Sequence, residues 1–262
     1  MKTAQEYQKR LQRHLDELKW LYCELYPGRE DMFTQLCEQM EAWYQERPES
    51  EKKLDREREQ EPAWYSRQDM LGMMLYIDAF AGNLKGVKKK LPYLEACNVN
   101  YLHLMPFLDT PKGKSDGGYA VADYRKVQPA LGTMEELASL CSACHEKKMS
   151  VCMDFVMNHT SEDHEWAKRA LAGEKEYQDR YFFYDTPDIP QEFEKTVPQV
   201  FPTTAPGNFT WREECQKYVM TSFYPYQWDL NYSNPVVFNE MVYNMLYLSL
   251  IHISEPTRHS LI

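Results

Sequence analysis

The segment Ser115–Tyr119 reads Ser-Asp-Gly-Gly-Tyr and carries a side chain whose chemistry suits a polyhydroxylated ligand. An ionised carboxylate such as Asp116 only accepts hydrogen bonds, and it can accept them from two neighbouring sugar hydroxyls at once. Gly117 and Gly118 let the backbone turn sharply beside it, because neither has a Cβ. Taken alone, Asp-Gly-Gly is typical of a plain turn, so a binding role depends on what surrounds it.

The surrounding sequence predicts buried parallel strands with helices between them. Three near-continuous apolar runs indicate strands: Met73–Phe80, Asn100–Met105 and Ser150–Met157. A helical stretch covers about 84–96, and a second begins at Thr133, which forms a capping box with Glu136. This alternation favours an α/β fold. The pattern does not require a closed barrel.

The strand order places polar residues on one face of the fold. In a parallel barrel, chemistry gathers at the carboxyl ends of the strands and in the loops that follow. The loop 106–133, which contains Asp116, follows the second strand, and His159 directly follows the third. An isolated histidine is more often structural, but this position favours a functional side chain. Asp154 lies within the third strand and is expected to support the site and not to catalyse.

The rest of the chain divides into three kinds of segment. Residues about 4–45 have apolar side chains at helical spacing on either side of Pro27-Gly28, which predicts two amphipathic helices. Residues 46–61 are almost wholly polar and are interpreted as a solvated helix face or connector. Residues about 160–225 are rich in proline and aromatic residues without regular alternation. A long irregular excursion of this kind is usually functional.

Composition narrows the classes of partner. The 262 residues have a net charge of −10, which argues against a nucleic-acid or anionic-membrane partner and fits a neutral ligand. No apolar run approaches the roughly 20 residues of a membrane span, and the charged N-terminus does not read as a signal peptide. Seven cysteines, an odd number, suggest a reducing, cytoplasmic environment. Cys141–His145 matches a haem-attachment string, but its cysteines share a helix face with Leu137 and Leu140, so no cofactor is expected.

Three stretches together resemble a known family. They are Lys114–Thr133, Asp154–Trp166 and Gln227–Pro235. In order and spacing they are similar to the first half of an α-amylase-superfamily catalytic barrel, glycoside hydrolase family 13, and most similar to amylosucrase and its sucrose-hydrolysing relatives. The resemblance implies an incomplete TIM (β/α)8 barrel with its first three strands, an all-helical N-terminal domain and a subdomain inserted after strand 3.

The resemblance also implies domain boundaries. The helical domain and connector would be 1–66 and the first part of the barrel 67–160. The inserted subdomain would be 161–226, the return into the barrel 227–248 and a non-native tail 249–262.

Five residues take sugar-binding roles by this resemblance. Asp116 would hold glucose hydroxyls in the donor subsite, and Tyr119 would lie flat under the glucose ring, whose C–H face packs on an aromatic face. His159 would hydrogen-bond a glucose hydroxyl near the cleaved bond. Phe223 would line the donor glucose, and the Gln227 amide would face the fructose side. No metal site is expected.

The tail departs from the family. A retaining glycosidase needs a nucleophilic and an acid/base carboxyl group, which the family places at the ends of the fourth and fifth strands. Here the helix 238–247 leads instead into 249–262, which lacks the family's Arg-x-Asp and looks like a translated sequencing adapter. No catalytic residue can therefore be assigned, and the chain is expected to be an inactive fragment.

The full protein is expected to be a cytoplasmic amylosucrase-like enzyme that transfers glucose from sucrose, through a retaining mechanism, to a glucan or to water. One alternative is another family 13 enzyme of the sucrose phosphorylase or trehalose synthase type. A second is a non-catalytic carbohydrate-binding fragment, for which Asp116, Tyr119 and His159 would suffice for weak contact.

Overall fold

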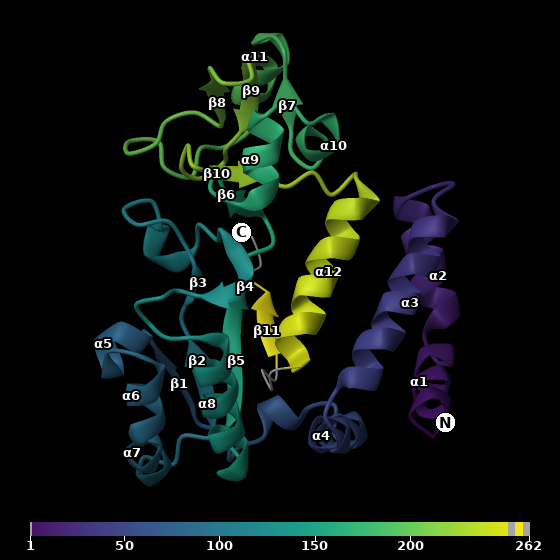
Figure 1. Ribbon diagram of the computed structural model, residues 1–262, viewed down its shortest axis with the longest axis vertical. Coiled ribbons are helices and arrows are strands. Elements are labelled where there is room, and N and C mark those ends of the chain that lie inside the picture. The colour runs from purple at the N-terminus through teal and green to yellow at the C-terminus, as the bar shows by residue number, and fades with distance from the viewer. Residues whose placement is uncertain (1, 251–254, 259–262) are drawn as a thin grey trace. The chain divides into compact units, whose positions relative to one another are not determined.

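The computed structural model describes residues 2–250 and 255–258 (Figure 1). Contacts divide the chain into two compact units, each made of separated segments. Unit 1 contains the chain up to Met105, Ala130–Asp154 and the segment that starts at Phe238. Unit 2 contains Pro106–Pro129 and Phe155–Val237. The domain boundaries expected from the sequence remain predictions.

Helices form the N-terminal part of unit 1, as the amphipathic pattern predicts, although the stretch before Pro27 divides into two helices at Arg13-His14 instead of forming one. They are α1 (Lys2–Gln12), α2 (Leu15–Leu25), α3 (Glu30–Glu46) and α4 (Glu49–Gln60). The apolar faces of α2 and α3 meet where Tyr22 lies 5.5 Å from Phe33, ring centre to ring centre. Asn239 lies on α12 (Pro235–Leu250), and its Oδ1 accepts a hydrogen bond of 2.9 Å from the Tyr22 hydroxyl. The Asn239 amide donates to the Met32 carbonyl at 3.0 Å, which fixes α12 against both helices.

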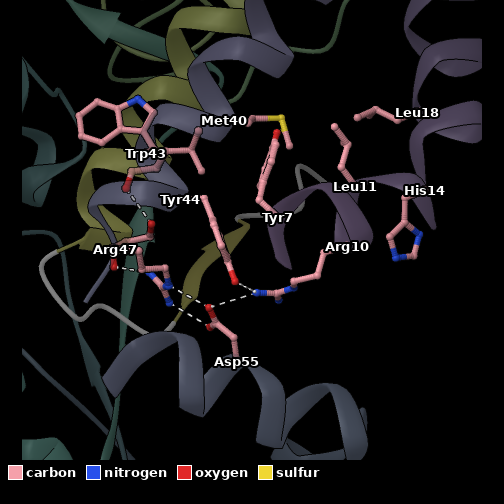
Figure 2. Close-up of a pocket in the computed structure, with 12 residues that line it drawn as sticks. Tyr7, Arg10, Leu11, His14, Leu18, Met40, Trp43, Tyr44, Arg47 and Asp55 are labelled. Atoms are coloured by element: carbon pink, nitrogen blue, oxygen red, sulfur yellow. Dashed lines mark hydrogen bonds and ion pairs between the residues drawn. The ribbon is translucent and has the colours of Figure 1, made fainter. Parts of the chain in front are cut away.

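The helices line an open pocket of about 360 Å³ with mainly apolar walls (Figure 2). Arg47 donates to both carboxylate oxygens of Asp55 at 2.8 and 3.0 Å along one side. Arg10 donates to the Tyr44 hydroxyl at 3.3 Å beside them. The polar helix α4 therefore forms part of this unit's interior and is more than a solvated connector, and its Glu51 and Lys52 are buried.

A four-stranded sheet forms the other part of unit 1. Its strands are β1 (Gly72–Leu75), β2 (Tyr101–Leu104), β5 (Ser150–Phe155) and β11 (Glu255–Arg258), in the order β1-β2-β5-β11. The three strands expected from the apolar runs are confirmed, and β1 pairs with β2, and β2 with β5, in parallel. β11 was not expected, because the tail shows no strand pattern; it occupies the edge that β5 would otherwise leave unpaired.

The first strand is shorter than its apolar run. β1 ends at Leu75, and the run continues as helix α5 (Ile77–Ala81), so the interpretation of 73–80 as one strand is wrong. The physical reason is that a short apolar run suits a buried strand and a buried helical turn equally well. Ile77 is buried in its helix just as Leu75 is buried in its strand.

Three helices lie beside this sheet (Figure 1): α6 (Leu84–Lys89), α7 (Leu91–Ala96) and α8 (Met134–Glu146). The stretch expected as one helix over 84–96 divides at Lys90, just before Leu91-Pro92. Thr133 caps α8 as expected, since its Oγ1 accepts from the Glu136 N–H at 3.3 Å, while the Glu136 carboxylate pairs with Lys85 at 2.7 Å. Cys141 and Cys144 are fully buried on α8, which confirms the packing stripe.

Unit 2 contains short elements joined by long loops. Two antiparallel pairs are formed by β3 (Leu108–Asp109) with β4 (Asp123–Val127) and by β6 (His159–Ser161) with β10 (Gln227–Asp229). A three-stranded antiparallel sheet contains β7 (Phe183–Tyr184), β9 (Lys217–Met220) and β8 (Phe209–Arg212). Short helices are α9 (Glu165–Leu171), α10 (Lys175–Gln178) and α11 (Asp188–Glu194). The proline-rich region is therefore more ordered than its sequence suggests.

Within the parts of the chain that the structure describes, no helix has both the length and the apolarity that crossing a bilayer requires.

Candidate functional site

Asp116 lies in a loop with an unusual backbone. Asp116, Gly117 and Gly118 have successive φ angles of +48°, +65° and +101°. A Cβ at Gly118 would lie 2.7 Å from the Pro106 Cβ and 2.8 Å from its carbonyl oxygen, so only glycine fits there. The Ser115 carbonyl closes the turn by accepting from the N–H groups of Gly118 and Ala120 at 3.0 and 2.9 Å. The loop thus presents the Asp116 carboxylate from a tightly constrained backbone.

Gln227 brings two of the expected site residues together. Strand β10 pairs with β6 so that Asp229 lies opposite His159 and Gln227 opposite Ser161. The Gln227 amide nitrogen donates to Asp116 Oδ2 at 3.0 Å and lies 3.0 Å from His159 Nε2. Its carbonyl oxygen accepts from the Tyr224 N–H at 3.0 Å, which sets the orientation of the amide. The side chains of Asp116, His159 and Gln227 therefore form one cluster.

His159 is a buried, neutral imidazole. Burial lowers the pKa of His159 to about 4. Its Nε2 lies 3.2 Å from the Tyr119 carbonyl oxygen, and its Nδ1 lies 3.3 Å from the Asn158 amide nitrogen. The Phe223 ring centre is 4.9 Å from the imidazole centre. Phe223 and Tyr119 thus both contact His159, and the flat stacking role of the Tyr119 ring stays a prediction.

Asp229 and Asn158 form a second layer behind the imidazole. Asp229 is buried, and its two oxygens accept from the Asn158 amide and the Ser222 N–H, each at 2.5 Å. Burial raises the pKa of Asp229, while these hydrogen bonds act in the opposite direction. Asp229 is not among the five residues that were expected to bind sugar. Its contact with Asn158 could have been found only from the register of β6 and β10.

Sequence reasoning missed an aromatic stack next to Phe223. The rings of Phe201 and Tyr224 lie 4.8 Å apart, and those of Tyr224 and Tyr226 lie 5.2 Å apart with an interplanar angle of 2°. Burial, together with the charge of Asp116, raises the pKa of Tyr226 to about 12. The alternation in Phe223-Tyr-Pro-Tyr226 was the available signal, because it places Tyr224 and Tyr226 two residues apart.

Glu162 forms ion pairs with residues of two other segments of unit 2. It forms an ion pair with Lys114, two residues before Asp116, and a second with Arg212 on β8 at 2.7 Å. Arg212 in turn donates to the Pro225 carbonyl, in the loop that leads to Gln227. The Asp116 loop and the Gln227 loop are thus connected through one carboxylate.

Asp154 contacts a histidine that is not part of the cluster. Its Oδ1 lies 2.9 Å from His103 Nε2, between neighbouring strands β5 and β2 of unit 1. The expectation that Asp154 supports the candidate site stays a prediction.

The cluster can bind hydroxyl groups, because it combines an anionic acceptor, a neutral imidazole and an amide within hydrogen-bonding distance. The described part of the chain contains no group of three or more His, Cys, Asp or Glu side chains placed to hold a metal ion. Asp229 is already bonded to two donors, so the cluster offers one carboxylate, Asp116, to a ligand. This arrangement suits binding and lacks the paired carboxyl groups of a retaining glycosidase.

Comparison with known proteins shows the family to which the chain is similar. The "Alpha amylase, catalytic domain" family matches residues 39–252. The trehalose synthase of Pimelobacter sp. (strain R48) is 35% identical over 167 residues, which are 63% of this chain and 28% of that enzyme. The α-glucosidase of Apis mellifera is 38% identical over 165 residues, 61% of this chain and 28% of that protein.

Solved structures give the same result. A mutant of the trehalulose synthase MutB, an enzyme from Pseudomonas mesoacidophila, in complex with its substrate sucrose has a TM-score of 0.61 and 27% identity, over 72% of this chain and 34% of that one. The chain therefore spans about a third or less of the length of these relatives. Since the family match covers most of its residues, the chain belongs to the α-amylase catalytic-domain family of glycoside hydrolases, family 13.

Proposed function

We propose that the Asp116–His159–Gln227 cluster binds the glucosyl group of an α-glucosyl disaccharide, as part of a retaining family 13 enzyme. One observation carries the proposal: the Gln227 amide nitrogen lies 3.0 Å from both Asp116 Oδ2 and His159 Nε2, although these residues are far apart in sequence. Polar groups that converge in this way fix the orientation of a bound small molecule. Tyr119 and Phe223 would add aromatic surface for the sugar's C–H face.

The names of the relatives favour the trehalose synthase type over the amylosucrase type expected first. The matched enzymes are named trehalose synthase and α-glucosidase. Sucrose stays a candidate because it is the ligand bound to the related MutB. We therefore propose trehalose, maltose and sucrose as the substrate class, with glucosyl transfer or isomerisation as the reaction of the whole enzyme. A cytoplasmic location belongs to this proposal.

Calorimetric titration of the chain with these three disaccharides tests the proposal, with methyl β-galactoside as the negative control. Asp116→Asn should weaken binding about 10- to 100-fold, because a hydrogen bond to a charged group contributes about 1.5–3 kcal/mol. Asp109→Asn is the matched control, since Asp109 belongs to the same loop region but pairs with Lys126 at 3.1 Å. Equal affinity of the Asp116 variant and the unsubstituted chain would contradict the proposal.

The same titration distinguishes the proposed function from the non-catalytic alternative. A carbohydrate-binding fragment without glucosyl specificity would bind the galactoside as well as the disaccharides. The proposed site should discriminate between them, because the sugar's hydroxyls must meet fixed partners on Asp116 and His159.

A further inference from the structure

A chain of hydrogen bonds joins one backbone group to another through the side chains of Asp229, Asn158 and His159, of which Asp229 and His159 are buried. Asp229 Oδ2 accepts from the Ser222 N–H at 2.5 Å, and Asp229 Oδ1 accepts from the Asn158 amide at 2.5 Å. The same amide nitrogen lies 3.3 Å from His159 Nδ1. On the other side of the ring, His159 Nε2 lies 3.2 Å from the Tyr119 carbonyl oxygen. Each contact restricts the donors and acceptors available to the next.

We propose that Asp229 is a positioning residue which, through Asn158, holds His159 in the tautomer that carries its proton on Nε2. An ionised carboxylate can only accept, so the Asn158 side chain must turn its NH₂ group toward Asp229. The second proton of that NH₂ group then faces His159 Nδ1, which must accept it. The ring proton is left on Nε2, where it can be donated to the Tyr119 carbonyl.

The opposite tautomer would be costly in this environment. A proton on Nδ1 would face the Asn158 N–H group, and the Nε2 lone pair would face the lone pairs of the Tyr119 oxygen. His159 is buried, so the Nδ1 proton could not turn to water instead, and only Nε2 would keep a partner, the Gln227 amide. A buried polar group without a partner is destabilising. The low pKa of His159 means that the ring carries only one of its two possible protons at neutral pH.

The Gln227 amide favours the other tautomer of His159, with the proton on Nδ1. This competition makes the role of Asp229 testable. The Gln227 amide orientation is fixed because its oxygen accepts from the Tyr224 N–H and its nitrogen donates to Asp116. That nitrogen lies 3.0 Å from His159 Nε2, so Gln227 alone would favour a bare Nε2. Two amides, each held by a carboxylate, thus compete for one imidazole. The Tyr119 carbonyl can accept only from a protonated Nε2, so it acts together with Asn158 and Asp229 against Gln227.

An amide in place of the Asp229 carboxylate should reverse the donors and acceptors along this series of hydrogen bonds. The Ser222 N–H still requires an oxygen opposite it, so the introduced NH₂ group would face Asn158. Asn158 would then turn its oxygen toward both that group and His159 Nδ1. The ring proton would move to Nδ1, and Nε2 would accept from Gln227.

The tautomer sets what the pocket offers to a ligand, and this step rests on the proposed function. With its proton on Nε2, His159 donates, while Asp116 beside it accepts. A sugar would then need one hydroxyl that donates to the carboxylate and one oxygen that accepts from the imidazole. In the opposite tautomer both groups would accept, and the pocket would select a different arrangement of hydroxyls.

Long-range ¹H–¹⁵N NMR correlations of the imidazole rings in the ligand-free chain read the tautomer directly. The His159 signals are assigned by their loss in His159→Gln. In the unsubstituted chain we expect a protonated Nε2 and a bare Nδ1. A protonated Nδ1 there would overturn the proposal without any variant.

The variant Asp229→Asn should shift the tautomer ratio at least about tenfold toward Nδ1 protonation. Asp154→Asn is the matched control, because it also removes a buried carboxylate but one that contacts His103; it should change the His103 signals and leave His159 unaltered. If Asp229→Asn does not fold, Gln227→Leu supplies the second variant: it removes the competing donor, so the Nε2 tautomer should persist.

An unchanged His159 tautomer in folded Asp229→Asn, or its loss in Gln227→Leu, would contradict the role of Asp229. The measurement needs no sugar, so failure of the chain to bind disaccharides would refute the proposed function and leave this result standing.

Discussion

His159 shares its low pKa with a neighbour along the chain. Burial lowers the pKa of both His159 and His164 to about 4, from an ordinary value of 6.5. His164 donates nothing to the cluster: its Nδ1 accepts from the Trp166 N–H at the start of α9. One of these histidines therefore belongs to the candidate site and the other to helix capping, although their titration is alike.

These two histidines predict a dependence of stability on pH. Between about pH 6.5 and pH 4 the unfolded chain binds a proton at each ring that the folded chain does not bind. The free energy of unfolding should therefore decrease as pH falls through this range, by up to about 1.4 kcal/mol per pH unit for each histidine. Above about pH 6.5 both rings are neutral in the folded and in the unfolded chain, so they should not change the free energy of unfolding further.

Urea unfolding at several pH values measures this slope. His159→Gln should remove the contribution of one ring and make the slope shallower. A slope in the His159 variant as steep as in the unsubstituted chain would show that this imidazole titrates normally.

Two of the site residues predicted from the sequence, Asp116 and His159, lie in short segments whose backbone conformation can be inferred locally. Asp116 precedes two glycines, and His159 follows a strand, so both could be placed near strand ends. The Asp229–Asn158–His159 hydrogen bonds could not be predicted, because they depend on the register of β10 against β6. Register between segments so distant in sequence has no local signal in either strand.

Among the elements, the turn Asp116–Gly118 is the one on which the site depends most directly. Gly118→Ala should destabilise the fold by about 1–3 kcal/mol, because the new Cβ would collide with the Pro106 backbone at a φ of +101°. It should also displace Asp116 and weaken sugar binding.

Gly113→Ala provides the comparison for that variant. Gly113 also has a positive φ, +77°, but a Cβ there would meet no atom within 4 Å. Its cost should be limited to the left-handed backbone, about 1–2 kcal/mol. Thermal or urea unfolding of both variants measures the difference, and an equal loss of stability would mean that contact with Pro106 is unimportant.

Element boundaries were the least predictable part of the fold. The apolar run after Gly72 contains both β1 and α5, and burial does not separate them, because Leu75 and Ile77 are both buried. The polar segment 46–61 looked fully solvated, yet Glu51 is buried against His145 at 3.3 Å. Such burial depends on which element lies opposite, and a charge pattern within one helix does not contain that information.

For the whole molecule, we expect binding without turnover. The candidate cluster presents Asp116 as its one available carboxylate, and a retaining mechanism needs two. The 262-residue chain should therefore bind disaccharides in calorimetry but release no glucose from trehalose, maltose or sucrose over hours in a coupled glucose assay. Glucose release that disappears in Asp116→Asn would contradict this expectation and show that a complete catalytic site is present.

The interleaved segments of the two units have a consequence for how the molecule can be taken apart. The polypeptide passes from one unit to the other after Met105, Pro129, Asp154 and Val237. A single protease cut at any one of these places would leave the two units covalently joined through the remaining crossings. Unit 1 also cannot be complete until the residues after Val237 have been synthesised, so its first helices must wait for most of the translation before they find their last partner, α12.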